Sequence, residues 1–134
     1  MSYARRLLDT YSDTFDIEAG VLAATIDALN DCAQACTADT AADLSERNVT
    51  EMVKCIRLCL DCTDICVATV GVTSLQTEYD ALVIKPLLEA CAAICKSCGD
   101  ECDRHAQMHE HCRVCAEACR RCEQDCRKLL QTMK

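Results

Sequence analysis

Apolar and cysteine residues recur along this chain in steps of three and four, which places them on one face of an α-helix. Four such stripes follow one another. Together they hold all fifteen cysteines, which are Cys32 and Cys36, then Cys55, Cys59, Cys62 and Cys66, then Cys91, Cys95, Cys98 and Cys102, and finally Cys112, Cys115, Cys119, Cys122 and Cys126. The strand-like alternation of aromatic and β-branched residues is missing from the sequence. The pattern therefore predicts four helices that turn their thiols towards a common centre, an all-α fold.

Four helices with short connections most often pack up-down-up-down, so we expect an antiparallel four-helix bundle. A chain of 134 residues is long enough for one such domain, spanning residues 1–134. We expect a short N-terminal helical arm at 2–12 and helices at about 16–41, 45–70, 74–105 and 109–132.

Capping and turn residues set these expected boundaries. The Asp16 carboxylate can cap the first helix, and the stretch from Asp43 to Glu46 fits a capping box before the second. Gly71 is a typical helix end. The third helix is expected to start near Ser74.

The third and fourth helices need a boundary that the sequence marks weakly. Residues His105 and His109 keep the helical spacing, and an unbroken helix across them would exceed about 40 residues against a mean near ~12. We therefore place a tight turn at 105–109. Pro86 lies inside the third helix, and we expect a kink there because proline removes a backbone donor.

Antiparallel packing arranges the stripes in levels. From the outermost inwards, the expected levels are Cys36, Cys55, Cys102 and Cys112, then Cys32, Cys59, Cys98 and Cys115, then Leu29, Cys62, Cys95 and Cys119, and then Thr25, Cys66, Cys91 and Cys122. Aliphatic residues close one end of this column, called here the aliphatic end. The other end, called here the histidine end, gathers Met52, His105, Met108 and His109, with His111 nearby.

Charge and hydropathy limit the possible partners. The chain carries 14 Lys and Arg against 22 Asp and Glu, so it lacks the basic face that nucleic acid requires. No apolar run approaches the ~20 residues that span a bilayer. Asp9 follows Arg5-Arg6-Leu7-Leu8 at once and breaks the apolar segment of an export signal, so we expect a cytoplasmic protein with reduced thiols.

Dense reduced thiols on inner helix faces indicate soft-metal binding. Four-thiolate zinc sites would each leave two net negative charges in the core, whereas one Cu(I) per thiolate leaves the column neutral. We expect multiple Cu(I) ions per monomer, bound by the fifteen thiols. His105 and His109 extend the thiol face and are expected to serve as copper ligands or at the entry of the column. Met52, Met108 and His111 lie at the same end and are expected to take part with them. A thiol redox buffer and a zinc reservoir remain alternatives.

Other metal and catalytic chemistries fit poorly. A di-iron bundle needs inward-facing Glu residues and Glu-x-x-His pairs, and the predicted inner faces of the four helices contain no Glu. The Cys-x-x-Cys units lack the strand–helix–strand context of redox enzymes. With no catalytic constellation in the sequence, we expect a protein that is not an enzyme.

The repeated Cys-x3-Cys-x2-Cys-x3-Cys units, the Cys32-x3-Cys36 pair and the His/Met end resemble the copper storage proteins of the cytosolic type. The resemblance covers nearly the whole chain. It implies a four-helix bundle filled with Cu(I), a homotetramer, and a copper chaperone or copper enzyme as donor or acceptor. The first helix offers only two cysteines, which implies less metal on that side.

Overall fold

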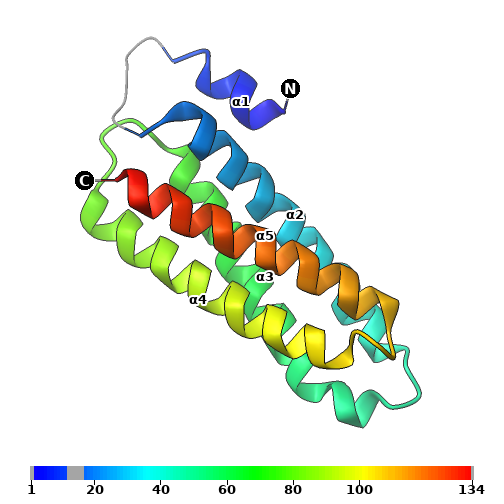
Figure 1. The fold of residues 1–134 in the computed structure, drawn as a ribbon. Coiled ribbons are helices and arrows are strands. Elements are labelled where there is room, and N and C mark those ends of the chain that lie inside the picture. Colours follow the sequence, from blue (N-terminus) through cyan, green and yellow to red (C-terminus); the bar gives the residue numbers. More distant parts are fainter. Residues whose placement is uncertain (1, 12–16, 134) are drawn as a thin grey trace.

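The computed structural model describes residues 2–11 and 17–133, and helices make up most of this part of the chain. They are α1 (Tyr3–Leu8), α2 (Ala19–Leu44), the short 3-10 helix η1 (Val49–Met52), α3 (Val53–Ser74), α4 (Ala81–His105) and α5 (Glu110–Thr132). Helices α2 to α5 lie side by side in alternating direction (Figure 1). Each packs against its neighbour in sequence, and α5 closes the ring on α2. This confirms the predicted antiparallel four-helix bundle.

Local side-chain caps start two of the bundle helices. The Glu18 carboxylate accepts hydrogen bonds from the backbone N–H groups of Gly20 and Val21, at 2.9 and 2.7 Å, and so begins α2. Asp80 accepts from the N–H of Leu82 at 2.9 Å and begins α4. The predicted cap Asp16 lies outside the described residues. Helix α4 runs through Pro86 and remains one element from Ala81 to His105.

Two predicted boundaries around α3 were wrong. Gly71 lies inside the helix, which continues to Ser74, so Ser74 ends α3 instead of starting α4. A glycine inside a helix costs only about 1 kcal/mol relative to Ala, and buried side chains beyond it offset that cost. One of them is Thr73, whose hydroxyl donates to the Thr69 carbonyl at 2.6 Å and holds the last turn against the core.

The predicted capping box from Asp43 to Glu46 was also wrong. Helix α2 continues to Leu44, and Asp43 is a fully buried residue of its last turn. Its carboxylate takes part in a buried cluster with Cys112 and His111 and so does not cap the next helix. After η1, helix α3 begins at Val53, later than the expected residue 45.

The core has a sulfur-rich section and an aliphatic section. Every cysteine is at most 1% exposed. The aliphatic end of the bundle lies below the thiols, where α2 and α4 begin and α3 and α5 end. Its core is filled by Leu22, Ile84, Leu88, Leu129 and Thr69. Hydrophobic burial at this end can stabilise the bundle without metal.

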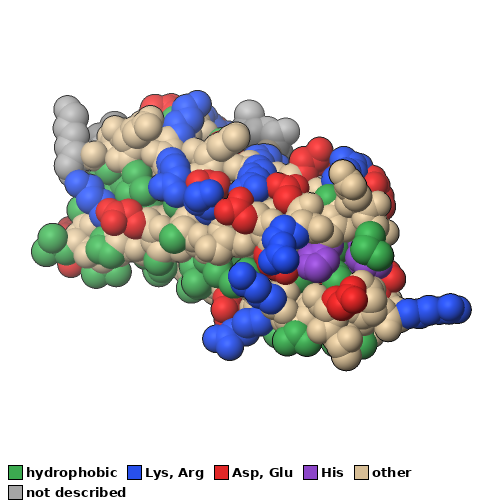
Figure 2. Space-filling view, turned by 60° about the horizontal axis from the view of Figure 1, so that its bottom comes forward, with side chains coloured by type: hydrophobic (Ala, Val, Ile, Leu, Met, Phe, Trp, Pro, Cys, Tyr) green, Lys and Arg blue, Asp and Glu red, His purple; other side chains and the backbone are tan. Residues whose placement is uncertain are grey.

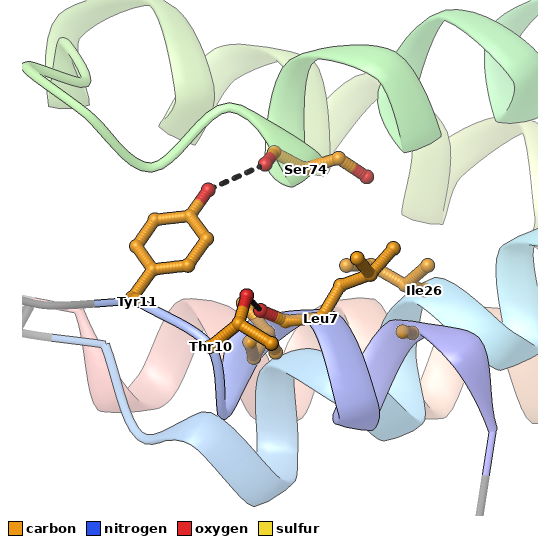
Figure 3. A pocket seen from close by; sticks show the side chains of 7 residues that line it. Leu7, Thr10, Tyr11, Ile26 and Ser74 are labelled. Atoms are coloured by element: carbon orange, nitrogen blue, oxygen red, sulfur yellow. Dashed lines mark hydrogen bonds between the residues drawn. The ribbon is translucent and has the colours of Figure 1, made fainter.

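Helix α1 packs against α2 beside the aliphatic end. Tyr11 follows α1, and its hydroxyl donates a hydrogen bond to the Ser74 carbonyl at 3.1 Å, which ties the arm to the end of α3 (Figure 3). Between the arm and the bundle lies a cavity of about 230 Å³, lined by Ala4, Leu7, Leu8, Thr10, Tyr11, Ile26 and Ser74. No helix of the described residues is long and apolar enough to cross a membrane.

Candidate metal centre

The thiols of α3 and α4 face each other in rungs along the bundle axis. The paired Sγ atoms are 3.7 Å apart for Cys55 and Cys102, 3.7 Å for Cys59 and Cys98, 3.8 Å for Cys62 and Cys95, and 3.9 Å for Cys66 and Cys91. These four rungs are the pairs that the antiparallel levels predict. Two equal stripes with the same 4-3-4 spacing have one obvious register, and these helices adopt it.

Helix α2 lies one level deeper than predicted. Cys36 was placed beside the outermost thiols, but its Sγ lies 3.7 Å from Cys115, 3.8 Å from Cys119 and 4.0 Å from Cys98. Cys32 likewise lies 3.6 Å from Cys62. The two thiols of α2 therefore fall in the middle of the column, and both sit within reach of α5.

The thiols form overlapping groups that could each hold a metal ion. Within each group the ligand atoms lie within 4.8 Å of one another. The groups include Cys32, Cys66, Cys95 and Cys122; Cys32, Cys36, Cys62 and Cys119; Cys36, Cys98, Cys115 and Cys119; Cys59, Cys98, Cys102 and Cys115; and Asp39 with Cys55, Cys59 and Cys102. Because neighbouring groups share members, a thiolate in this column can bridge two ions. The geometry favours a continuous cluster over separate closed sites.

Asp39 is a buried carboxylate that the sequence analysis missed. Its Oδ2 accepts three thiols, from Cys59 at 3.5 Å, Cys102 at 3.7 Å and Cys55 at 3.8 Å. Burial raises the pKa of Asp39 to about 6, although its hydrogen bond with His111 acts against that rise. The signal was present in the sequence, because Cys32, Cys36, Asp39 and Asp43 repeat the 4-3-4 spacing of the thiol stripes.

His111 lies directly against the outer thiols. Its Nδ1 lies 2.6 Å from Asp39 Oδ1, 3.4 Å from Asp43 Oδ1 and 3.6 Å from Cys112 Sγ, and its Nε2 lies 3.1 Å from Glu46 Oε1. Burial alone would lower the pKa of His111, but the hydrogen bonds to Asp39 and Glu46, together with the negative charges of Asp39 and Asp43, raise it above its ordinary value. Sequence spacing had ranked this residue below His105 and His109.

The other two histidines also lie at the histidine end. The Nε2 of His105 is 3.0 Å from the buried Glu101 carboxylate. The His109 ring stacks on His111 with centroids 5.2 Å apart, and its Nδ1 lies 3.5 Å from Glu46. Among the described residues, the buried His109 Nε2 has no hydrogen-bond partner, which leaves a nitrogen lone pair for a ligand. Imidazoles reach the surface at this end of the molecule, beside acidic and basic side chains (Figure 2).

The two methionines of this end differ in their surroundings. Met52 is fully buried, with its Sδ 4.0 Å from the Asn48 side-chain nitrogen. Met108 is 73% exposed in the turn between α4 and α5. The structure thus places one thioether in the core near the end of the thiol column and the other at the solvent boundary.

Burial keeps the outermost thiol protonated in the protein without metal. Burial raises the pKa of the Cys112 thiol well above its ordinary value, and the negative charges of Asp39 and Asp43 raise it further. A metal ion that binds here must displace the thiol proton and supply the positive charge that the site lacks.

A helical bundle whose axis is a column of buried, closely spaced thiols defines a class of protein, the metal-binding helical bundle with a core of soft ligands. Residues 19–131 match the family described as copper storage protein, and the chain belongs to that family.

The chain is similar to solved structures of copper storage proteins from Streptomyces lividans. One is the copper storage protein Ccsp from Streptomyces lividans loaded with 10 copper equivalents, 51% identical, covering 97% of this chain and 99% of that chain with a TM-score of 0.95. The second is a cytosolic copper storage protein from Streptomyces lividans with five coppers, 55% identical, covering 86% and 96% of the two chains with a TM-score of 0.85.

A relative from Bacillus subtilis (strain 168), described as the uncharacterized cysteine-rich protein YhjQ, is also similar. It is 39% identical over 95 residues, which is 71% of this chain and 82% of that relative.

Proposed function

We propose that this protein stores Cu(I) ions as thiolate clusters along the axis of its bundle. The observation that carries the proposal is the column of fifteen buried thiols. Along most of its length neighbouring Sγ atoms lie 3.6 to 4.0 Å apart, and Cys122 joins the column within 4.8 Å of Cys32, Cys66 and Cys95. The copper-loaded relatives from Streptomyces lividans support the choice of metal. All fifteen cysteines are proposed as ligands.

The shared thiols favour Cu(I) over zinc. Zinc prefers four ligands in a closed tetrahedron, so zinc storage would need separate sets of four thiols. Cys32, Cys36 and Cys59 each belong to two of the groups, which suits an ion that accepts two or three bridging thiolates. A neutral column of Cu(I) thiolates also avoids buried net charge.

The histidine end is proposed as the path of copper entry and exit. Neutral imidazole and thioether bind Cu(I) without adding charge, and so more weakly than the thiolates beyond them. We assign this transfer role to His105, His109 and His111, with Met108 at the surface and Met52 nearest the core. Weak outer ligands followed by strong inner ones permit transfer without trapping the ion at the surface.

The remaining features of the proposal concern the location, partners and assembly of the protein. We propose a cytoplasmic location, as for the cytosolic relative, and a storage role without catalysis. A copper chaperone or copper enzyme would exchange metal with the histidine end. We also propose a homotetramer. Val53, Leu60 and Val67 are 64%, 48% and 58% exposed and recur every seven residues on α3, a spacing by which helices of different subunits can pair.

Anaerobic titration with Cu(I) against a competing chelator tests the storage function. We expect roughly one Cu(I) per thiolate, on the order of fifteen per monomer, while Zn²⁺ should saturate near about four. Saturation with Cu(I) at one or two equivalents would contradict storage and favour a chaperone. Absorption spectra after anaerobic exposure to peroxide test the redox-buffer alternative, which requires reversible disulfide formation in place of metal uptake.

A further inference from the structure

A cavity of about 230 Å³ lies between the N-terminal arm and the bundle, at the end away from the histidines (Figure 3). Its walls come from α1 and the residues after it, from α2 and from the end of α3. The lining residues are Ala4, Leu7, Leu8, Thr10, Tyr11, Ile26 and Ser74. No cysteine is among these described residues, so copper storage in the thiol column gives this cavity no role.

The walls of the cavity are mostly aliphatic. Leu8 of α1 and Ile26 of α2 are 6% and 5% exposed and form its buried side, whereas Leu7 is 61% exposed and brings the wall to the solvent boundary. Among the described residues that line the cavity, none carries a charged side chain. An ion that entered would lose its hydration without gaining a partner of opposite charge, so the cavity disfavours charged molecules.

Most polar groups of the walls are bonded within the protein. The Tyr11 hydroxyl donates to the Ser74 carbonyl at 3.1 Å and accepts the backbone N–H of Gln76 at 3.4 Å. The Thr10 hydroxyl donates to the Leu7 carbonyl at 2.6 Å. Within the part of the chain that the structure describes, the Ser74 hydroxyl makes no hydrogen bond, which leaves it available to a ligand.

We propose that this cavity binds a small apolar molecule of about the size of a benzene ring, carrying at most one hydroxyl group. An apolar protein cavity of ~150 Å³ stays dry and takes up benzene, so the volume here is sufficient. The aliphatic walls supply hydrophobic burial, and the Ser74 hydroxyl can bond a single polar group of the ligand. The proposal does not depend on copper storage, because it concerns another class of ligand and none of the thiols.

Binding should also hold the arm against the bundle. The ligand would contact α1, α2 and the end of α3 at once, so it recognises only the docked arm. A ligand that binds one state of a protein stabilises that state. Backbone amide exchange in α1 should therefore slow when the ligand is present, while exchange in α5, which contributes no lining residue, should not change.

Titration of the reduced, full-length, copper-free protein with benzene, phenol and benzoate, followed by methyl NMR, tests this site. We expect saturable shifts at the methyl groups of Leu7, Leu8 and Ile26 with benzene and with phenol. The dissociation constants should be on the order of 1 mM, because so small a molecule buries little surface. Benzoate, which is charged, should produce no saturable shift.

Two variants fill the cavity from opposite walls, Ala4→Phe from the arm and Ile26→Phe from the bundle. Each should weaken benzene binding by more than about tenfold. Ala41→Phe, at an exposed position near the other end of α2, is the matched control and should bind benzene like the wild type. Circular dichroism and Cu(I) capacity should match the wild type in all three variants. Shifts that do not saturate, or wild-type affinity in both filled variants, would overturn the site.

Discussion

The Asp39 carboxylate accepts the Cys59 thiol at 3.5 Å, across the interface between α2 and α3. Asp39 occupies the position at which the spacing of the α2 stripe would place a third cysteine, three residues after Cys36. An acid thus stands in the outer part of a column that is otherwise lined by sulfur. The consequence is a polar layer between the solvent and the thiols.

Asp39→Cys should extend the thiol column. The side chain of residue 39 already lies within 3.8 Å of three thiols, so a sulfur there completes a group of four. We expect Cu(I) capacity to rise by about one ion per monomer, measured by anaerobic titration against a chelator. Asp39→Ser is the control, because it removes the carboxylate without adding a thiol. Equal capacity in the two variants would refute the assignment of this position to the column.

The rungs between α3 and α4 show what the sequence could determine. The stripes that contain Cys55 and Cys102 have equal length and identical spacing. Only one antiparallel register buries every thiol of both stripes against a partner, and this register was predicted correctly. The turn before α5 was predicted correctly as well, because an unbroken helix would have left thiols without partners. Helical period and the cost of exposing apolar faces were sufficient here.

Helix α2 shows where this reasoning failed. With two thiols, its stripe could slide by one level, and the stripe continues into Asp39 and Asp43, which contact thiols of other helices. Acidic residues near a helix boundary are usually exposed or act as caps, and Asp43 was interpreted as a cap. Their burial depends on His111 and on thiols from other helices. Such a cluster forms only in three dimensions, so local propensity could not reveal it.

The copper-free protein should lose stability as the pH rises. The folded-state pKa of Asp39 is raised to about 6 from an ordinary 3.8, so the folded state binds more protons than the unfolded state between these values. The contribution is therefore full at low pH and is lost as the pH rises through 6. Asp43 and His111, which face Asp39, also have raised pKa values and act in the same direction.

Urea unfolding at pH 4.5 and pH 7.5 measures this effect, with these pH values chosen as about one and a half units either side of 6. Wild type should lose about 1–3 kcal/mol more than Asp39→Asn over this range. Exposed carboxylates with lowered pKa values, such as Glu18 and Asp100, act in the opposite direction but equally in both proteins. Identical pH profiles would show that Asp39 is not titrating as its burial requires.

Leu88→Ala should separate stability from metal exchange. Leu88 is fully buried among the aliphatic residues that fill the end of the bundle opposite the histidines. We expect a loss of ~2–5 kcal/mol in the free energy of unfolding, from the missing transfer free energy and the cavity left behind. Rates of Cu(I) uptake by the folded variant should match the wild type. A marked change in those rates would indicate that copper passes through the aliphatic end.

Replacing His105 and His109 by Phe should slow copper exchange through the opposite end. The two imidazoles are 15% and 10% exposed on their side chains, and the His109 Nε2 lacks a hydrogen-bond partner among the described residues. His105 is held by Glu101, so its nitrogen is less available. We therefore expect His109→Phe alone to account for most of the slower uptake and slower removal by a chelator, while capacity falls by no more than about one or two ions.

Stopped-flow mixing with a Cu(I)–chelator complex measures the uptake rate, and His105→Phe serves as the partner variant in a double-mutant comparison. If both single variants slow exchange equally, the unpartnered Nε2 is not what distinguishes His109. If the double variant exchanges copper at the wild-type rate, the histidine end is not the entrance. His111 is expected to contribute less to this exchange than His109, because its Nδ1 lies 2.6 Å from Asp39 and its Nε2 lies 3.1 Å from Glu46.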